Sequence, residues 1–259
     1  MSETARILHL DSVDNVRDIG GYDTVDGQKL AMGRLFRAPQ FHNIKDSDKA
    51  KLDTLGIKLI CDLRTPSGRE RAPLEWPTKG VEILTSDKFA AKGNLLERFL
   101  NERKLTEKDA RAFMTETYAN MPFDPGHVEL FSGLLKHMSQ GLVPAMILSA
   151  GGKDRVGLFA TLTLIALGVS REVAISDYLL THVVVDPAAE AAAAIALLEE
   201  RGFSLSSDAA VALLGADRRY IEAALDAIRA KHGTVYGYLR EVIGLDFEES
   251  EALRKHLLA

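Results

Sequence analysis

The sequence predicts an α/β fold in which a mostly parallel central sheet is flanked by helices. Apolar runs of strand length alternate with segments of helical pattern, which indicates a largely parallel sheet covered on both faces. The strand-like runs are residues 35–37, 57–62, 81–84 and 143–148. No linker or repeat interrupts the 259 residues, of which 46% are hydrophobic, so one domain over residues 1–259 is predicted.

The predicted helices lie between and after these runs. Helical patterns cover residues 46–55 and 126–138, and a longer apolar run indicates a buried helix over 157–167. Within the segment 88–125, residues 88–117 are polar and helical in pattern, with the apolar Leu95, Leu96 and Phe99 at positions i, i+1 and i+4. It is expected to be an insertion outside the core.

The C-terminal stretch 186–259 is predicted to be a helical subregion. Asp186 followed by Pro187 has the order of an N-cap and a first helical residue. The alanine-rich residues 188–198 favour a helix strongly. Another helix is predicted over 217–232, with Gly233 as its left-handed cap.

A glycine-rich turn joins the run 143–148 to the buried helix. It reads SAGGKDRVG from Ser149 to Gly157. A strand, a glycine turn and a helix start aim several backbone N–H groups and the positive helix end at one point. Arg155 adds a planar fork of donors that matches two phosphate oxygens. The turn is therefore predicted to hold a phosphate dianion.

Two nucleotide-binding loops are excluded by spacing. A Walker loop requires Ser or Thr after its lysine and a glycine six residues before it, whereas Asp154 follows Lys153 and residue 147 is isoleucine. The dinucleotide fingerprint requires a glycine spacing that Gly151 and Gly152 do not supply. An ordinary glycine turn with its charged residues in solvent is the alternative to a phosphate site.

Three other segments carry a resemblance to a known family. The first reads NVRDIGGY from Asn15, followed by GRLFRA from Gly33, and the second reads CDLRTP from Cys61, followed by RERAP from Arg69. The third is the helical tail from Tyr220 to Ala259. Together with the turn they resemble the bacterial tyrosine and phosphoinositide phosphatases of the cysteine-dependent tyrosine phosphatase superfamily, whose loop reads HCxxGKDRTG.

The sequence departs from this family at the position of the nucleophile. Ser149 stands where the family has its catalytic cysteine, and Leu148 and Val156 replace the neighbouring histidine and threonine. A thiol is driven to thiolate by a helix N-terminus and nearby cations, whereas a serine hydroxyl needs an adjacent general base. No histidine lies within ten residues of Ser149 in the sequence. A covalent route is therefore predicted to be lost or badly weakened.

Two alternative explanations concern cysteine chemistry. A Cys→Ser change is the usual way to trap a substrate, but Leu148 and Val156 depart from the family as well, which favours natural divergence. The lone cysteine, Cys61, ends an apolar run and is not followed by a glycine turn. Such a cysteine is typically a small buried hydrophobic residue. A single thiol supplies neither a disulfide nor a cysteine-based zinc site.

The resemblance also implies roles for individual residues. The expected substrate-binding residues are Ala150, Gly151, Gly152, Lys153, Asp154 and Arg155. Lys153 would favour doubly charged or polyphosphorylated substrates, and Asp154 either orients the two cations or is a plain salt-bridge partner. For the general acid, Asp87 is the first candidate and Asp124 the second. The alternative role of each is that of a helix cap or turn residue.

Further residues are expected behind or around the site. Arg17, Asp18, Asp62 and Arg64 are expected to support it through structural pairing. The resemblance implies that 88–125 forms a lid, with a peripheral helix pair as the alternative. His42, His127, His137, His182 and His232 lack metal-ligand spacing and are expected at the surface or at helix ends. No metal and no cofactor are therefore predicted.

Charge and composition limit the partners. A net charge of −5 argues against nucleic-acid binding. The N-terminus lacks the apolar core of a signal peptide, and no apolar run reaches the roughly 18 residues of a membrane span. We therefore expect a cytoplasmic protein without integral membrane association. Its expected partner is a phosphorylated protein, a phosphopeptide or a phosphoinositide.

Two functions follow from these observations. In the first, the protein binds phosphomonoesters with little or no turnover. In the second, it is an active phosphomonoester hydrolase that uses Ser149, an activated water, or a cysteinyl-phosphate in a form that retains the cysteine. Hydrolysis of phosphate monoesters requires acceleration of up to about 10²¹-fold. The sequence favours binding, because the glycine turn and Arg155 are intact and the thiolate is absent. A purely structural protein would hold no anion at the turn.

Overall fold

The computed structural model describes residues 3–90, 99–100, 106–200 and 204–259. These residues contain a six-stranded sheet with the order β1-β2-β3-β6-β4-β5. Strands β3, β6, β4 and β5 are parallel, and β1 and β2 add an antiparallel edge. The strands are β1 (Ile7–Leu8), β2 (Val16–Asp18), β3 (Leu35–Ala38), β4 (Leu59–Asp62), β5 (Glu82–Leu84) and β6 (Ala145–Leu148). The predicted α/β fold with a mostly parallel sheet is therefore confirmed.

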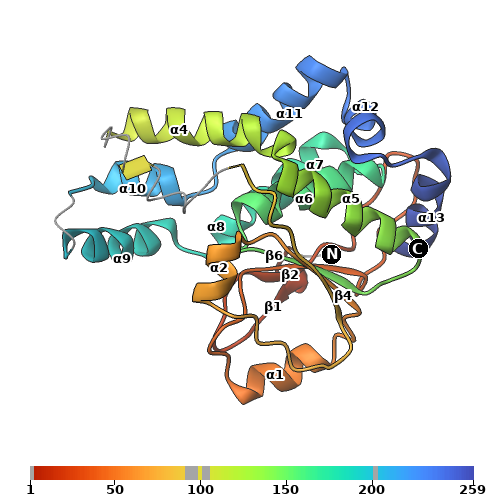
Figure 1. Ribbon diagram of the computed structural model, residues 1–259, viewed down its shortest axis with the longest axis horizontal. Helices are drawn as coiled ribbons and strands as arrows, with labels where there is room; N and C mark the ends of the chain where they lie inside the picture. The colour runs from red at the N-terminus through yellow and green to blue at the C-terminus, as the bar shows by residue number, and fades with distance from the viewer. Residues whose placement is uncertain (1–2, 91–98, 101–105, 201–203) are drawn as a thin grey trace.

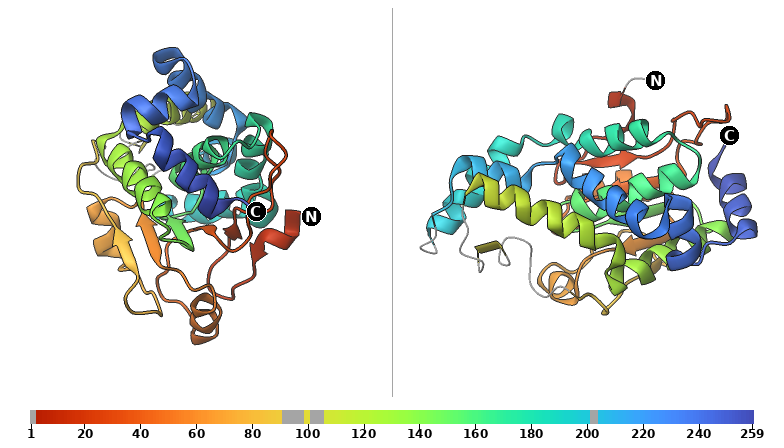
Figure 2. Two further views of the ribbon diagram at one scale, coloured as in Figure 1. Left: turned by 90° about the vertical axis from the view of Figure 1, so that its right-hand side faces the viewer. Right: turned by 90° about the horizontal axis from the view of Figure 1, so that it is seen from above.

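Helices cover both faces of this sheet. In Figures 1 and 2, α1 lies on one face and most of the other helices lie on the opposite face, where α4, α9 and α10 extend beyond the strands. The helices are α1 (Asp46–Asp53), α2 (Pro66–Arg71), α4 (Glu107–Asn120), α5 (Pro125–Ser139), α6 (Asp154–Ala166), α7 (Arg171–Leu179), α8 (Thr181–Val184), α9 (Pro187–Glu199), α10 (Ser207–Leu214), α11 (Arg218–His232), α12 (Val235–Tyr238) and α13 (Phe247–Leu257). Single turns lie at Glu3–Arg6, Met121–Phe123 and Leu239–Ile243.

The two faces bury separate hydrophobic clusters. On the α1 side, Phe36, Ile60 and Met146 from three neighbouring strands pack with Leu52 of α1. On the other side, alternate residues of the same strands join the larger core that α5, α6 and the C-terminal helices complete. A strand buried on both faces has apolar residues in succession rather than in alternation. This explains why β4 and β6 are continuous apolar runs in the sequence.

The boundaries of two predicted elements differ from the structure. The run 143–148 begins its ladder only at Ala145, because Pro144 has no N–H to donate. The buried helix begins at Asp154, three residues before the predicted start at Gly157, and includes Arg155 in its first turn. Strands β1 and β2 were not predicted, since two and three residues leave no readable periodicity.

The insertion 88–125 is described only in part. Leu95 and Leu96 lie outside the described residues. Phe99 is buried against Phe113 of α4, with ring centroids 5.4 Å apart. Helix α4 begins at the N-cap Thr106, whose side chain accepts a hydrogen bond from the N–H of Asp109. A packed helix therefore occupies the described end of this insertion, and its role as a lid stays a prediction.

The C-terminal subregion has the predicted helix starts. The Asp186 side chain accepts the N–H of Ala188 at the start of α9, and the Asp217 side chain caps α11. Gly233 follows α11 at φ +72°, where it ends the helix. No single helix in the described ranges is long and apolar enough to cross a membrane. The segments Arg171–Val184 and Pro187–Ala196 meet the length and composition requirement only as a pair bent by 59°.

One predicted surface or helix-end residue is buried. His127 lies in the first turn of α5, only 8% exposed, between the rings of Phe89 and Phe159. Its Nδ1 is 3.0 Å from the carbonyl oxygen of Met121, so Nδ1 carries the proton. Burial, and next the charge of Arg155, lower the pKa of His127 to about 4.

This burial predicts a pH dependence of stability. Because the pKa of His127 falls from 6.5 when unfolded to about 4 when folded, the unfolded chain binds more protons between these values. The contribution of the neutral His127 to the free energy of unfolding is fully present above pH 6.5. About 3 kcal/mol of that contribution is lost as the pH falls to 4. Urea unfolding of the parent and of His127→Asn, whose amide nitrogen replaces Nδ1, measures it. The difference between the two unfolding free energies should shrink as the pH falls, and parallel curves would contradict the prediction.

Candidate functional site

The turn after β6 lies at the carboxyl end of the central strands. β6 is paired with β3 on one side and with β4 on the other, so Ser149 leaves the sheet between their ends. Ser149 is 2% exposed, and its N–H donates to the carbonyl oxygen of Ala38, with the two heavy atoms 3.4 Å apart. Gly152 has φ +62°, and a Cβ there would lie 2.5 Å from the nitrogen of Pro39. Only glycine fits this crossing of the turn over the end of β3.

Helix α6 begins at this turn without a side-chain cap. Lys153 occupies the N-cap position and makes no capping hydrogen bond. The first N–H groups of a helix have no partner within the helix. A buried helix start therefore leaves several backbone donors and the positive end of the helix dipole for an anion.

A cavity of about 1040 Å³ opens in front of the turn. The lining residues from the turn are Ser149, Ala150, Gly151, Lys153, Asp154 and Arg155. Arg64, Asp124 and His127 line it from other elements, and α4 and α10 add apolar walls that include Phe113 and Leu213. The structure thus brings the predicted binding residues to one cavity, except Gly152, whose carbonyl is held on the other side of the turn.

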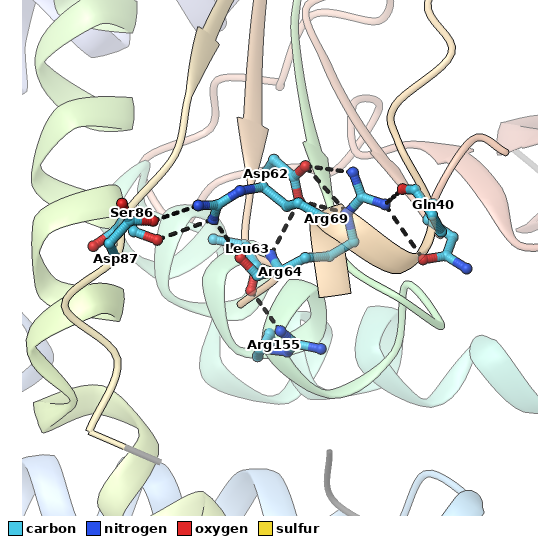
Figure 3. A network of polar contacts seen from close by, with 9 residues as sticks. Gln40, Asp62, Leu63, Arg64, Arg69, Ser86, Asp87 and Arg155 are labelled. Carbon is cyan, nitrogen blue, oxygen red and sulfur yellow. Dashed lines mark hydrogen bonds and ion pairs between the residues drawn. The ribbon is translucent and has the colours of Figure 1, made fainter. Parts of the chain in front are cut away.

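The side chain of Arg155 lies in this cavity wall. Its NH1 donates to the carbonyl oxygen of Leu63, just after β4, as Figure 3 shows. Burial lowers the pKa of Arg155 from its ordinary value near 12.5, while the charges of Asp154 and Asp62 act in the opposite direction. Its remaining guanidinium donors have the planar geometry that matches phosphate oxygens.

Lys153 and Asp154 make contacts that the sequence did not reveal. The Lys153 ammonium donates to the carbonyls of Leu214 and Gly215 at the end of α10, and it lies 3.5 Å from Asp154 Oδ1. The same Asp154 oxygen accepts a 2.7 Å hydrogen bond from the hydroxyl of Tyr118. Lys153 therefore joins the turn to the helical subregion, and Asp154 is its salt-bridge partner.

The two general-acid candidates have different surroundings. The Asp87 side chain is 78% exposed, is ion-paired with Arg69 and is not among the residues that line the cavity (Figure 3). Asp124 lines the cavity. Its Oδ1 caps α5 by accepting the N–H groups of Gly126 and His127 at 2.9 and 3.3 Å. Asp124 is thus the better placed of the two, although it also has the capping role.

The four supporting residues divide into two groups. Asp62 and Arg64 form a buried pair with NH2 and Oδ2 2.6 Å apart, and Arg64 also reaches the cavity wall (Figure 3). It therefore lies closer to the site than expected. Asp18 accepts the N–H groups of Gly20 and Gly33 and organises the turn after β2. Arg17 is fully buried beside α7.

Sequence reasoning missed the residues that hold the turn from behind. Arg37 on β3 donates through NH2 to the Gly152 carbonyl at 3.0 Å, and its NH1 is paired with Asp177 of α7 at 3.0 Å. The Asn15 side-chain amide lies 3.4 Å from the same carbonyl oxygen. The available signal was an arginine inside an otherwise apolar strand, because such a residue is seldom buried unless it is paired.

Cysteine and metal chemistry find no support at this site. Cys61 is fully buried on β4, its Sγ lies 3.7 Å from the Leu130 carbonyl, and burial raises its pKa far above the ordinary value. A thiol in this state is not a nucleophile. Within the described ranges no three His, Cys, Asp or Glu side chains are grouped so that they could hold a metal ion.

Comparison with known proteins agrees with this arrangement. The profile of the tyrosine phosphatase family matches residues 8–259. A protein of Cupriavidus necator that is named as a tyrosine-protein phosphatase is 29% identical, over 97% of this chain and 88% of the relative. The triple specificity protein phosphatase PtpB of Mycobacterium tuberculosis is 25% identical, over 88% of this chain and 90% of the relative.

The family match runs from β1 to the C-terminus and includes β6, the turn and α6. The fold, the uncapped helix start and the cavity in front of it are thus parts of one matched unit. This chain belongs to the tyrosine phosphatase family.

Proposed function

We propose that this protein binds phosphomonoesters at the turn 149–155 and hydrolyses them slowly or not at all. The observation that carries the proposal is the uncapped start of α6, whose backbone donors face a cavity that Arg155 also lines. A phosphate dianion accepts hydrogen bonds from such donors and is attracted by the helix dipole and the guanidinium. The backbone donors of this site do not depend on the side chain at position 149.

The surroundings of Ser149 support a lack of turnover. Among the residues that the structure describes, none is hydrogen-bonded to Ser149 Oγ, so no general base is in place to take its proton. A serine hydroxyl without such a base is a weak nucleophile. His127 lines the same cavity, but its pKa of about 4 makes it a weak base.

The expected ligands are phosphorylated proteins, phosphopeptides or phosphoinositides. The cavity volume of about 1040 Å³ leaves room for the group that carries the phosphate. Apolar side chains of α4 and α10 form its walls, which suits an aromatic or aliphatic carrier. The name of the mycobacterial relative also points to a phosphatase that accepts more than one class of substrate.

An active phosphomonoester hydrolase is the second candidate function. It is favoured by the family itself, since both relatives are named as phosphatases. In that case Ser149 or a water in the cavity would attack phosphorus, and a nearby acid would protonate the leaving oxygen. Turnover measurements separate the two candidates.

We predict that the parent protein binds inorganic phosphate but does not hydrolyse 4-nitrophenyl phosphate above background. Ser149→Cys should gain activity, because a thiolate at the start of α6 needs no separate base. Calorimetry with phosphate and release of nitrophenol measure the two properties. Arg155→Met should weaken phosphate binding by about 10- to 100-fold in both backgrounds, because it removes charge-assisted hydrogen bonds.

The other outcomes identify the alternatives. Activity in the parent that disappears in Ser149→Ala would overturn the binding proposal and make serine the nucleophile. A cysteine variant that binds phosphate but stays inactive would show that Leu148, Val156 or the acid has changed as well. A parent that neither binds phosphate nor hydrolyses the ester, with a cysteine variant that does neither, would exclude both candidate functions.

The general acid can be identified in the Ser149→Cys background. Asp124→Asn should slow hydrolysis of phenyl phosphate more than that of 4-nitrophenyl phosphate, because the poorer leaving group needs a proton more. Asp87→Asn should slow neither, since the Asp87 side chain is 78% exposed and paired with Arg69. The ratio of kcat/KM for the two esters is the measurement. A change of that ratio in Asp87→Asn alone would assign the acid to Asp87.

A further inference from the structure

A buried charged cluster lies behind the phosphate-binding turn. It consists of Arg17, Arg37 and Asp177, with Tyr22 as a fourth member. In the antiparallel register of β2 and β3, Arg17 stands directly opposite Arg37, so both side chains lie on the same face of the sheet. Both arginines are fully buried, and Asp177 is 1% exposed.

The carboxylate of Asp177 contacts Arg37 and Tyr22, and it makes no hydrogen bond with Arg17. Its Oδ2 is paired with Arg37 at 3.0 Å, and its Oδ1 accepts a 3.0 Å hydrogen bond from the hydroxyl of Tyr22. Arg17 reaches only the backbone carbonyl of Asp177, at 3.3 Å. Its Nε and NH1 are buried and have no hydrogen-bond partner among the described residues. The cluster therefore contains two cations and one anion.

Two buried cations beside a single buried anion are electrostatically unfavourable. Like charges directly opposite each other on neighbouring strands repel, and a buried charge without a full set of partners is destabilising. Burial, and next the charge of Arg37, lower the pKa of Arg17 to about 9, so it still carries its charge at neutral pH. An anion close to the cluster would reduce this unfavourable electrostatic energy.

The cluster also fixes the direction of a backbone donor. Arg37 NH2 and the amide of Asn15 hold the Gly152 carbonyl on the buried side of the turn. In a trans peptide, the carbonyl of one residue and the N–H of the next point in opposite directions. The N–H of Lys153, at the N-cap of α6, is therefore directed away from the cluster.

We propose that Arg37 and Arg17 are positioning residues for an anion on the turn. Arg37, held by Asp177, orients the Gly152–Lys153 peptide so that its N–H faces the ligand. Arg17 supplies from behind a positive charge that Asp177 does not neutralise and that a phosphate dianion compensates. The inference rests on the proposed phosphate-binding function of the turn.

The test compares variants of the full chain by phosphate calorimetry and by urea unfolding. Arg17→Met should weaken binding of inorganic phosphate about tenfold, without a loss of stability, because it removes an uncompensated buried charge. Arg17→Lys should retain the parent's affinity, since it keeps the charge.

Arg37→Lys should lose affinity, because an ammonium cannot bridge Asp177 and the Gly152 carbonyl as a planar fork does. In ¹⁵N spectra the phosphate-induced shift of the Lys153 amide should shrink in this variant.

Arg254→Met is the matched control. Arg254 also bridges a carboxylate, that of Asp26, and a backbone carbonyl, that of Leu167, and it is not part of the cluster. The control should leave phosphate affinity unchanged while it lowers stability. Parent-like affinity in Arg17→Met, or a loss of stability in Arg17→Met as large as in the control, would overturn the inference alone. Failure of the parent to bind phosphate would overturn the proposed function and the inference together.

Discussion

The buried ion pair of Arg37 and Asp177 connects the parts of this protein that have to meet at the turn. Arg37 comes from a central strand, Asp177 from α7, and the Gly152 carbonyl that Arg37 holds comes from the turn itself. Breaking a buried pair by removing one partner typically destabilises a protein by about 3–5 kcal/mol, because it leaves an unpaired charge. The position of the turn relative to the sheet therefore depends on this contact as well as on Gly152.

A second connection joins the turn to the helical subregion. Lys153 donates to the carbonyls of Leu214, the last residue of α10, and of Gly215, its C-cap. Nε2 of His182 is hydrogen-bonded to the carbonyl oxygen of Ala216. Arg111 of α4 is paired with Asp217 at 2.7 Å. Four consecutive residues, from the last residue of α10 to the N-cap of α11, are thus held by side chains from the turn, from α8 and from α4. The cavity walls and the backbone of the turn are consequently parts of one packed unit.

The sequence predicted well what depends on local pattern. Continuous apolar runs predicted β4 and β6, the capping residue Asp186 predicted the start of α9, and all but one of the residues singled out in the turn line one cavity. It did not reveal contacts between distant segments. Arg37 and Asp177 are 140 residues apart, and nothing in either local sequence indicates that they pair. The same holds for His127, which local pattern places at a helix start and tertiary packing buries beside the site.

The proposed function separates phosphate binding from phosphate hydrolysis. The groups proposed to bind phosphate are the N–H groups of the turn, the start of α6, Arg155 and the buried arginines, and none of these groups changes when the side chain at position 149 changes. Hydrolysis would need a nucleophile at position 149, where this chain has a serine hydroxyl that is hydrogen-bonded to no base among the described residues. The charges and backbone groups around the turn are fixed by the fold, whereas reactivity would depend on the side chain at position 149 and on its neighbours. On the proposed function, the groups that hold an anion can therefore stay assembled around a weak nucleophile.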